Sequence, residues 1–269
     1  MIDIIRHNRK AWDKESTDGS PWCTPVDDCI IERAKEGQWE VILTPNKSVP
    51  GAWFGDLKHQ WVLCLASGGG QQAPVLAAAG AYVISLDNSL QQLTKDLTVA
   101  RKHALPLHCL QADMSDLSML KDEAFDLIFH PVANLFVADV HRVWRECYRV
   151  LKPGGVLLSG FMNPAYFLFD QDEARQSGGL DVKFTQPYSD LHSLDKKKLQ
   201  TLLDNHEALI FGHTLGDQIG GQVDAGFAIT GFYEDHWSDE ATPLNRFSST
   251  SMATRALKPP VSPGHFWRD

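Results

Sequence analysis

Two apolar segments joined by a glycine-rich turn and a helix place the strongest constraint on the fold of this chain. The first segment is WVLCLA, residues 61–66, and the second is AYVISLD, residues 81–87. Between them lie SGGG and QQAPVLAAAG, in which Pro74 falls in the first helical turn, where proline is tolerated. Strands that are apolar on both sides are buried on both faces, and a helical connection between them requires a parallel sheet. The segment therefore predicts a β–α–β unit.

The same alternation of helix and strand continues to about residue 162. Ser89 is placed to cap a helix whose apolar residues recur at spacings of three and four. Further strands are expected at LPLHCLQ (105–111), FDLIFH (125–130) and VLLSGF (156–161), the last after an amphipathic helix that ends at KPGG (152–155). Five β units in this pattern predict a doubly wound α/β domain.

The remaining parts of the chain are interpreted as additions to one domain. Residues 1–60 are rich in tryptophan and proline and are expected to form an N-terminal cap on the core of residues 61–162. Residues 163–213 break the rhythm and predict an insertion with two strands around the helix of residues 194–204. Residues 214–258 predict a last helix, opened by a capping box, and two strands that pair antiparallel because no crossover helix fits between them.

Composition narrows the possible partners. The 269 residues include 25 Lys and Arg against 34 Asp and Glu, a net charge of −9, so we expect no nucleic acid partner, because phosphate binding needs clustered positive charge. No apolar run approaches the roughly 18 residues of a membrane span, and no signal peptide is visible. We expect a small-molecule substrate and a cytoplasmic protein whose five cysteines are buried free thiols. Nothing in the sequence indicates the oligomeric state.

The glycine turn and the acid that ends the next strand predict a nucleotide site. The turn lets a ligand approach the backbone and the free N–H groups of the following helix. Asp87, which lies 19 residues after Gly68, is placed to accept hydrogen bonds from two ribose hydroxyls. Because Gly68-x-Gly70-x-x-Ala73 matches a dinucleotide pattern, an NAD(P)-dependent oxidoreductase is one interpretation.

The wider pattern resembles the class I S-adenosylmethionine-dependent methyltransferases. Five segments match successive motifs of that family: VLCLASGGG, LDNS, QADMSDL, AFDLIFHPVANLF and YRVLKPGGVLLSG. The resemblance implies a Rossmann-like fold with a mostly parallel seven-stranded sheet, a final antiparallel strand and helices on both faces. It favours a methyltransferase over the oxidoreductase, because a sheet that finishes with an antiparallel pair suits this family better. The implied methyl donor is S-adenosylmethionine and the expected acceptor is a small molecule.

The resemblance also implies which residues bind the cofactor: the backbone of Ala66, Gly68 and Gly70 at its methionine part, Asp87 at the ribose, Asn88 along the adenine, and Asp113 with the Met114 backbone at the adenine edge. Two positions depart from the family, which usually has an acid in place of Cys64 and glycine in place of Ala66. A protein that binds the cofactor without catalysis is therefore a second alternative. Gln71 and Gln72 are expected either to bond the amino acid end of the cofactor or to be exposed.

His130 is the candidate general base, because it follows the fourth strand at the edge where ligands bind in such sheets. The alternative is a ring that packs or caps a turn. Trp12 of the cap is expected to cover the cofactor. Other candidates for an acceptor pocket are the aromatic residues Trp53, Phe136, Tyr166 and Phe167. The pair Gly220–Gly221 predicts a close approach, to the insertion or to substrate. No histidine or acid pattern has metal-ligand spacing, so no metal is expected.

Overall fold

The predicted β–α–β unit is the centre of the fold. A computed structural model describes residues 2–260. In it, β1 (Trp61–Leu65) runs parallel to β2 (Tyr82–Asp87), and α3 (Gln72–Ala78) connects them. The glycine turn between β1 and α3 therefore opens at the carboxyl edge of the sheet, as the sequence predicts.

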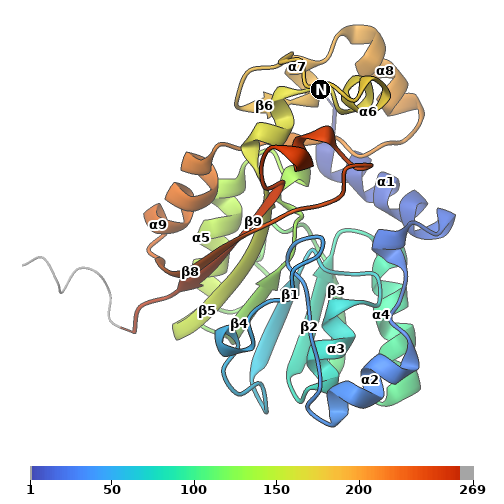
Figure 1. The fold of residues 1–269 in the computed structure, drawn as a ribbon. Coiled ribbons are helices and arrows are strands. Elements are labelled where there is room, and N and C mark those ends of the chain that lie inside the picture. The colour runs from blue at the N-terminus through green and yellow to red at the C-terminus, as the bar shows by residue number, and fades with distance from the viewer. Residues whose placement is uncertain (1, 261–269) are drawn as a thin grey trace, which may run out of the picture.

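The sheet has seven strands in the order β3-β2-β1-β4-β5-β9-β8. The remaining strands are β3 (Leu107–Gln111), β4 (Phe125–His130), β5 (Leu151–Met162), β8 (Ala228–Asp235) and β9 (Ser251–Leu257). β9 pairs antiparallel with both β5 and β8, whereas the other pairs are parallel (Figure 1). This confirms the predicted fold class. The strand order reverses at β1, next to β4, and a crevice for ligands forms at such a reversal.

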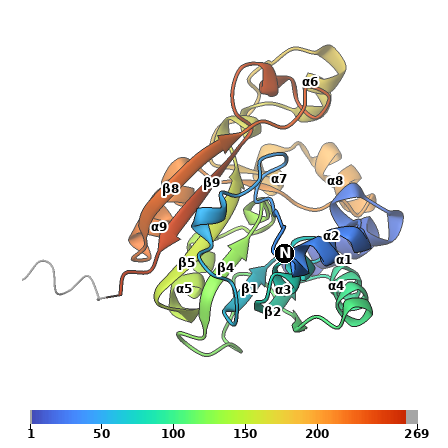
Figure 2. The ribbon, with the colours of Figure 1, turned by 60° about the horizontal axis from the view of Figure 1, so that its bottom comes forward.

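Helices cover both faces of the sheet (Figure 2). One face packs against α2 (Asp28–Lys35), α3 and α4 (Leu90–His103). The other packs against α5 (Val140–Val150) and is reached by the short α9 (Gly221–Asp224), which lies on α5. The buried stripe of α5 recurs at helical spacing: Val140, Val143, Trp144, Cys147 and Val150.

Two segments surround the carboxyl edge of the sheet. The helix α1 (Ile4–Asp18) lies along α4, followed by the turn η1 (Pro21–Cys23) and, further on, η2 (Gly51–Trp53). The inserted segment stands above the edge in Figure 1 and consists of α6 (Gln171–Ser177), β6 (Tyr188–Ser189), α7 (Asp190–Ser193), α8 (Lys196–Asp204) and β7 (Phe211–Gly212). β6 and β7 pair antiparallel, which confirms the two predicted strands around a helix. Shorter turns are η3 (Asn134–Phe136), η4 (Pro164–Leu168), η5 (Gly216–Gly220) and η6 (Pro243–Arg246).

Several smaller predictions have clear outcomes. The capping box is confirmed, because the Thr214 N–H donates to Asp217 Oδ2 at 2.9 Å and the Asp217 N–H donates to Thr214 Oγ1 at 3.1 Å. The close approach expected at Gly220–Gly221 is present, but the expected partner, the insertion or the substrate, was wrong. A Cβ on Gly221 would lie 2.8 Å from Trp144 Cδ1, so the glycine serves packing on α5 rather than on the insertion. All five cysteines are free thiols, but they are not all buried as expected, because Cys109 is half-buried and Cys29 is exposed. Among residues 2–260, no helix has the length and apolar character needed to cross a membrane.

Candidate active site

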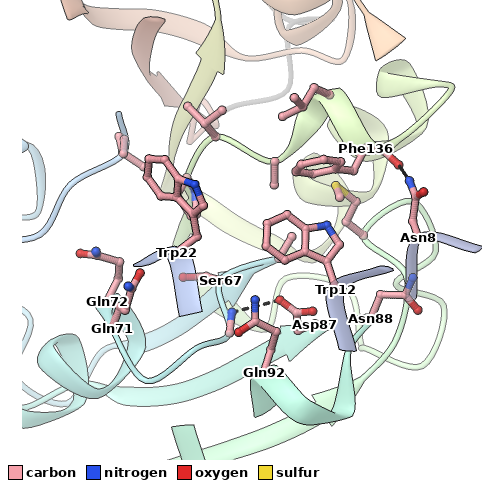
Figure 3. A pocket seen from close by; sticks show the side chains of 18 of the residues that line it. Asn8, Trp12, Trp22, Ser67, Gln71, Gln72, Asp87, Asn88, Gln92 and Phe136 are labelled. Carbon is pink, nitrogen blue, oxygen red and sulfur yellow. Dashed lines mark hydrogen bonds between the residues drawn. The ribbon is translucent and has the colours of Figure 1, made fainter. Parts of the chain in front are cut away.

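A cavity of about 390 Å³ extends along the carboxyl ends of β1 to β5. Its volume is within the roughly 300–1,000 Å³ range of small-molecule sites. The lining includes five residues that the family resemblance implies at the cofactor: Ala66, Gly68, Asp87, Asp113 and Met114. Figure 3 shows Trp12 and Phe136 close together, Trp22 on the opposite side, and Asp87 beside Gln92. Residues at the ends of all five parallel strands and residues of the N-terminal segment therefore line the cavity.

The glycine turn and Asp87 are held together by hydrogen bonds. Asp87 Oδ2 accepts from the Gly68 N–H at 3.0 Å, and Oδ1 accepts from the Ser89 N–H at 2.9 Å. A Cβ on Gly68 would lie 2.7 Å from Gln92 Cβ, so only glycine fits at this position without movement. Burial raises the pKa of the Asp87 carboxyl to about 6 despite these hydrogen bonds. The carboxyl is therefore preorganised at the end of β2 and titrates near neutrality.

Gly70 lies behind the cavity wall, in contrast to the predicted direct contact with the cofactor. Its N–H donates to Asp96 Oδ1 at 2.6 Å, and a Cβ there would lie 2.8 Å from Pro25 Cβ. Its φ of +78° is in the left-handed region that favours glycine. Gly70 therefore shapes the turn and receives the N-terminal segment, while its neighbours contact the cavity.

Asp96 is a residue of the site that the sequence analysis missed. It is fully buried on α4, where it accepts from the Gly70 N–H and, at 2.5 Å, from Ser85 Oγ of β2. Burial raises the pKa of this carboxyl to about 7. The clue in the sequence is its position on the buried stripe of α4, three residues after Leu93 and three before Val99, where a charged side chain requires a partner.

The helix α1 is fastened to the end of β2 through Asn88. Asn88 Oδ1 accepts from Arg9 Nε at 2.9 Å, and its Nδ2 donates to the Ile5 carbonyl at 2.9 Å. Ser89 Oγ donates to Asp13 Oδ1 at 2.6 Å. These contacts hold Trp12 of α1 at the cavity, where its ring meets Phe136 edge-on with centroids 5.0 Å apart. Asn88 lines the cavity and anchors α1 at the same time.

His130 is placed differently from a general base that reaches substrate. Its ring is fully buried and is not among the residues that line the cavity. Nδ1 donates to the Leu65 carbonyl at 2.9 Å, and Nε2 lies 2.6 Å from Asn134 Oδ1. Burial lowers the pKa of the ring. The geometry corresponds to the alternative of a packed histidine, which links the end of β4 to β1 and η3.

The glutamines after the glycine turn hold the N-terminal segment. Gln71 Nε2 donates to the carbonyls of Pro21 and Thr24, each at 3.0 Å, and Gln72 Oε1 accepts from the Ile42 N–H at 3.0 Å. Both side chains still line the cavity.

The aromatic lining differs in part from the prediction. Phe136 and Tyr166 line the cavity as expected, whereas Trp53 and Phe167 do not. Two tryptophans that the sequence analysis did not select do line it, Trp22 and Trp237, and their rings meet with centroids 5.6 Å apart. They come from distant parts of the chain, so their local sequences do not reveal their contact.

Two polar atoms at the cavity have no hydrogen-bond partner among the described residues. They are Ser67 Oγ and Gln92 Oε1, and both are buried. A buried polar atom without a partner costs free energy, which a polar ligand in the cavity would recover. Together with the Asp87 carboxyl, these atoms fit a ligand with both ribose hydroxyls and an amino acid group. Within residues 2–260, no cluster of three or more His, Cys, Asp or Glu side chains could hold a metal ion.

The sheet order, the glycine turn and the cavity define an α/β methyltransferase, and comparisons with known proteins agree. The family model described as "Methyltransferase domain" matches residues 63–159. The protein named "Uncharacterized methyltransferase YbaJ" of Bacillus subtilis is 52% identical over 258 residues, which span 96% of this chain and 100% of that protein. The chain belongs to the class I S-adenosylmethionine-dependent methyltransferases, and this excludes the oxidoreductase interpretation.

Solved structures share the fold. An S-adenosylmethionine-dependent methyltransferase from Mesorhizobium loti has a TM-score of 0.58 at 21% identity and covers 77% of this chain and 94% of its own. The 1,6-didemethyltoxoflavin-N1-methyltransferase of Burkholderia thailandensis also has a TM-score of 0.58, at 13% identity, with 94% of this chain and 88% of its own covered. Because the family is shown by the relative of 52% identity, the protein is an S-adenosylmethionine-dependent enzyme.

Proposed function

We propose that this enzyme methylates a small molecule inside the cavity at the carboxyl edge of the sheet. The observation that carries the proposal is the division of the cavity into two ends. The polar end lies at β2 and β3, with Asp87 and Asp113, and the apolar end lies at β4 and β5, with Val132 and Met162. A cavity of this volume, with α1 and the inserted segment in its walls, accommodates a small acceptor better than a polymer.

The polar end is suited to the methyl donor. Asp87, Asp113 and Met114 line this end; the Asp87 carboxylate would accept hydrogen bonds from the ribose hydroxyls, and Asp113 with the Met114 backbone would meet the adenine edge. Ser67 Oγ and Gln92 Oε1 are free to bond the amino acid part. When bound, S-adenosylmethionine supplies the methyl group from a sulfonium. The chain's own residues contribute by holding the two reactants in line and excluding water.

In this proposal His130 is a positioning residue rather than the base. Its hydrogen bond to the Leu65 carbonyl keeps the end of β4 aligned with β1. Its other ring nitrogen contacts Asn134 of η3, whose Nδ2 donates to Gln218 Oε1 at 3.0 Å. A general base, as the sequence analysis expected of His130, requires a ring that faces the acceptor. The buried contacts of His130 with Leu65 and Asn134 instead align β4 with β1 and η3.

His130→Ala is therefore expected to lower the free energy of unfolding by about 1–3 kcal/mol, because it leaves buried polar groups of Leu65 and Asn134 without their partner. The turnover number of the remaining folded enzyme should fall less than tenfold. Urea unfolding and initial rates measure the two effects. A fall of a hundredfold or more at unchanged stability would return His130 to the role of general base.

Asp96→Asn tests how the buried carboxyl under the glycine turn affects stability. The pKa of Asp96 is raised to about 7 in the folded chain, whereas an unfolded aspartate titrates near 3.9. The folded state thus retains a proton that the unfolded state has released, so this group's contribution to stability falls as pH rises from about 4 to 7. Relative to wild type, the variant should gain stability across that window in urea titrations. A difference between the two proteins that does not change with pH would contradict this expectation.

The size of the acceptor is tested by fractionation. Purified enzyme and S-adenosylmethionine are incubated with a cell extract that has been separated into filtrate and retentate of a small-pore membrane. We expect S-adenosylhomocysteine to accumulate with the filtrate. Accumulation only with the retentate, and its loss after nuclease or protease treatment of that fraction, would overturn the proposal of a small acceptor.

We also propose a cytoplasmic location. All five cysteines, including the exposed Cys29, are free thiols, and free thiols are typical of a reducing compartment. Localisation of a tagged chain in cell fractions tests this proposal.

A further inference from the structure

The described residues that form the apolar end of the cavity carry no charged side chain. Its walls come from four parts of the chain: the N-terminal segment at Thr44, the end of β4 at Val132, the end of β5 at Met162, and the inserted segment at Ile210. Across the described residues that line the whole cavity there is no lysine, arginine, histidine or glutamate. The two acids that line it, Asp87 and Asp113, belong to the ends of β2 and β3, beyond β1 from this end.

A cation beside this end is engaged elsewhere. Arg175 lies close enough to Tyr166, which lines the cavity, to lower the pKa of its phenol. The Arg175 guanidinium bonds the Asp172 carboxylate and donates to the Ala241 carbonyl at 3.4 Å. An anionic acceptor would therefore enter the apolar end without a cation to replace the water that it loses.

The described residues also supply no base at this end. Tyr166 is its ionisable side chain, and burial raises the pKa of the phenol, so it keeps its proton. None of the other residues that form this end, such as Val132, Leu135 and Met162, can accept a proton from an acceptor during transfer.

On the basis of the proposed function, we propose that the acceptor is an uncharged, largely apolar molecule that presents a neutral lone pair to the methyl group. The lone pair forms the new bond to the methyl carbon, and the electron pair of the carbon–sulfur bond stays on sulfur. The positive charge of the sulfonium passes to the acceptor atom. If that atom carried hydrogen, the proton leaves to water after transfer, so no side-chain base is needed.

A matched pair of probes tests this selectivity without the natural acceptor. Calorimetry first measures the binding of S-adenosylhomocysteine to the full chain. The protein saturated with it is then titrated with 2-naphthylmethanol or with 2-naphthoate, which have the same ring system but differ in charge. We expect the neutral probe to bind at least about tenfold more tightly than the carboxylate, because the carboxylate loses hydration without gaining a partner.

A charge introduced at the apolar end sharpens the test. Val132→Lys places a cation at the cavity wall and should reverse the preference in favour of 2-naphthoate. Val223→Lys on α9 is the matched control, because Val223 is exposed and does not line the cavity. The control should keep the preference of the wild type.

The outcomes separate the two proposals. Failure of the wild type to bind S-adenosylhomocysteine would overturn the assignment of the cavity, and the acceptor class with it. Normal binding of S-adenosylhomocysteine together with equal or tighter binding of 2-naphthoate, or with no binding of the neutral probe, would overturn the acceptor class alone. The wild-type comparison decides this even if Val132→Lys does not fold.

Discussion

Asp87→Ala is expected to weaken the binding of S-adenosylmethionine by about 1–3 kcal/mol, or roughly five- to 150-fold in Kd. The carboxyl is held at the end of β2 by the N–H groups of Gly68 and Ser89, so its oxygens are already oriented toward the cavity before ligand binds. Its removal takes away a charged acceptor of hydrogen bonds and also loosens the glycine turn. Calorimetric titration with S-adenosylmethionine and S-adenosylhomocysteine measures the loss.

The control for this substitution is Asp224→Ala, which removes an exposed carboxylate on α9, away from the cavity. It should leave the affinity within twofold of wild type. If Asp87→Ala bound both compounds as tightly as the control, the ribose would be held elsewhere and the assignment of the polar end would fail.

The pH dependence of binding follows from the same carboxyl. Its pKa is about 6 in the protein without ligand, and ribose hydroxyls donate to the ionised form. The affinity of the wild type should therefore rise as pH increases from 5 to 7 and become constant above. Asp87→Asn should lose this rise, because the amide does not titrate in that window. A wild-type affinity that falls with pH would have the wrong sign for this mechanism.

Trp144→Ala is expected to have the largest effect on stability, a loss of about 3–5 kcal/mol in the free energy of unfolding. The indole is fully buried on α5, and its Nε1 donates to the Asp217 carbonyl at 2.9 Å. It also fills the space that Gly221 leaves open and meets the His130 ring edge-on at 6.3 Å. Truncation leaves a cavity between α5, α9 and the sheet and a buried carbonyl without its donor.

Urea unfolding measures this loss, with Trp61→Ala as the control because Trp61 is 42% exposed at the start of β1. The control should cost less, since a substantial part of the lost area was already in water, whereas Trp144 is fully buried. A loss below about 1 kcal/mol for Trp144→Ala would show that α9 collapses onto α5 without the indole.

Local patterns were sufficient for the framework of the fold. The apolar runs that became β1 and β2, the glycine turn between them and the buried stripe of α5 depend on residues within one turn or one strand of each other. For the same reason Asp87, which ends β2, could be predicted at a ligand site, whereas Asp113 was implied only by the resemblance to the methyltransferase family; both line the cavity.

Contacts between distant segments could not be predicted from such local patterns. His130 follows a strand like Asp87 does, yet its ring turns into the core toward Leu65 of β1. Gly70 matches a cofactor motif, yet Asp96 of α4 and Pro25 of the N-terminal segment occupy its surroundings. In each case a partner far along the chain decided which way the side chain or the N–H group pointed.

The sequence by itself therefore determined the α/β fold, because periodicity is a local property, and the resemblance of its motifs to a known family predicted the class of enzyme. Only the tertiary structure decided that the carboxyl of Asp96 supports the glycine turn, that Trp22 and Trp237 meet at the cavity, and that no Lys, Arg, His or Glu of the described residues lines it. The physical reason is that burial and hydrogen-bond partners depend on packing between segments, and no single segment of the sequence specifies that packing.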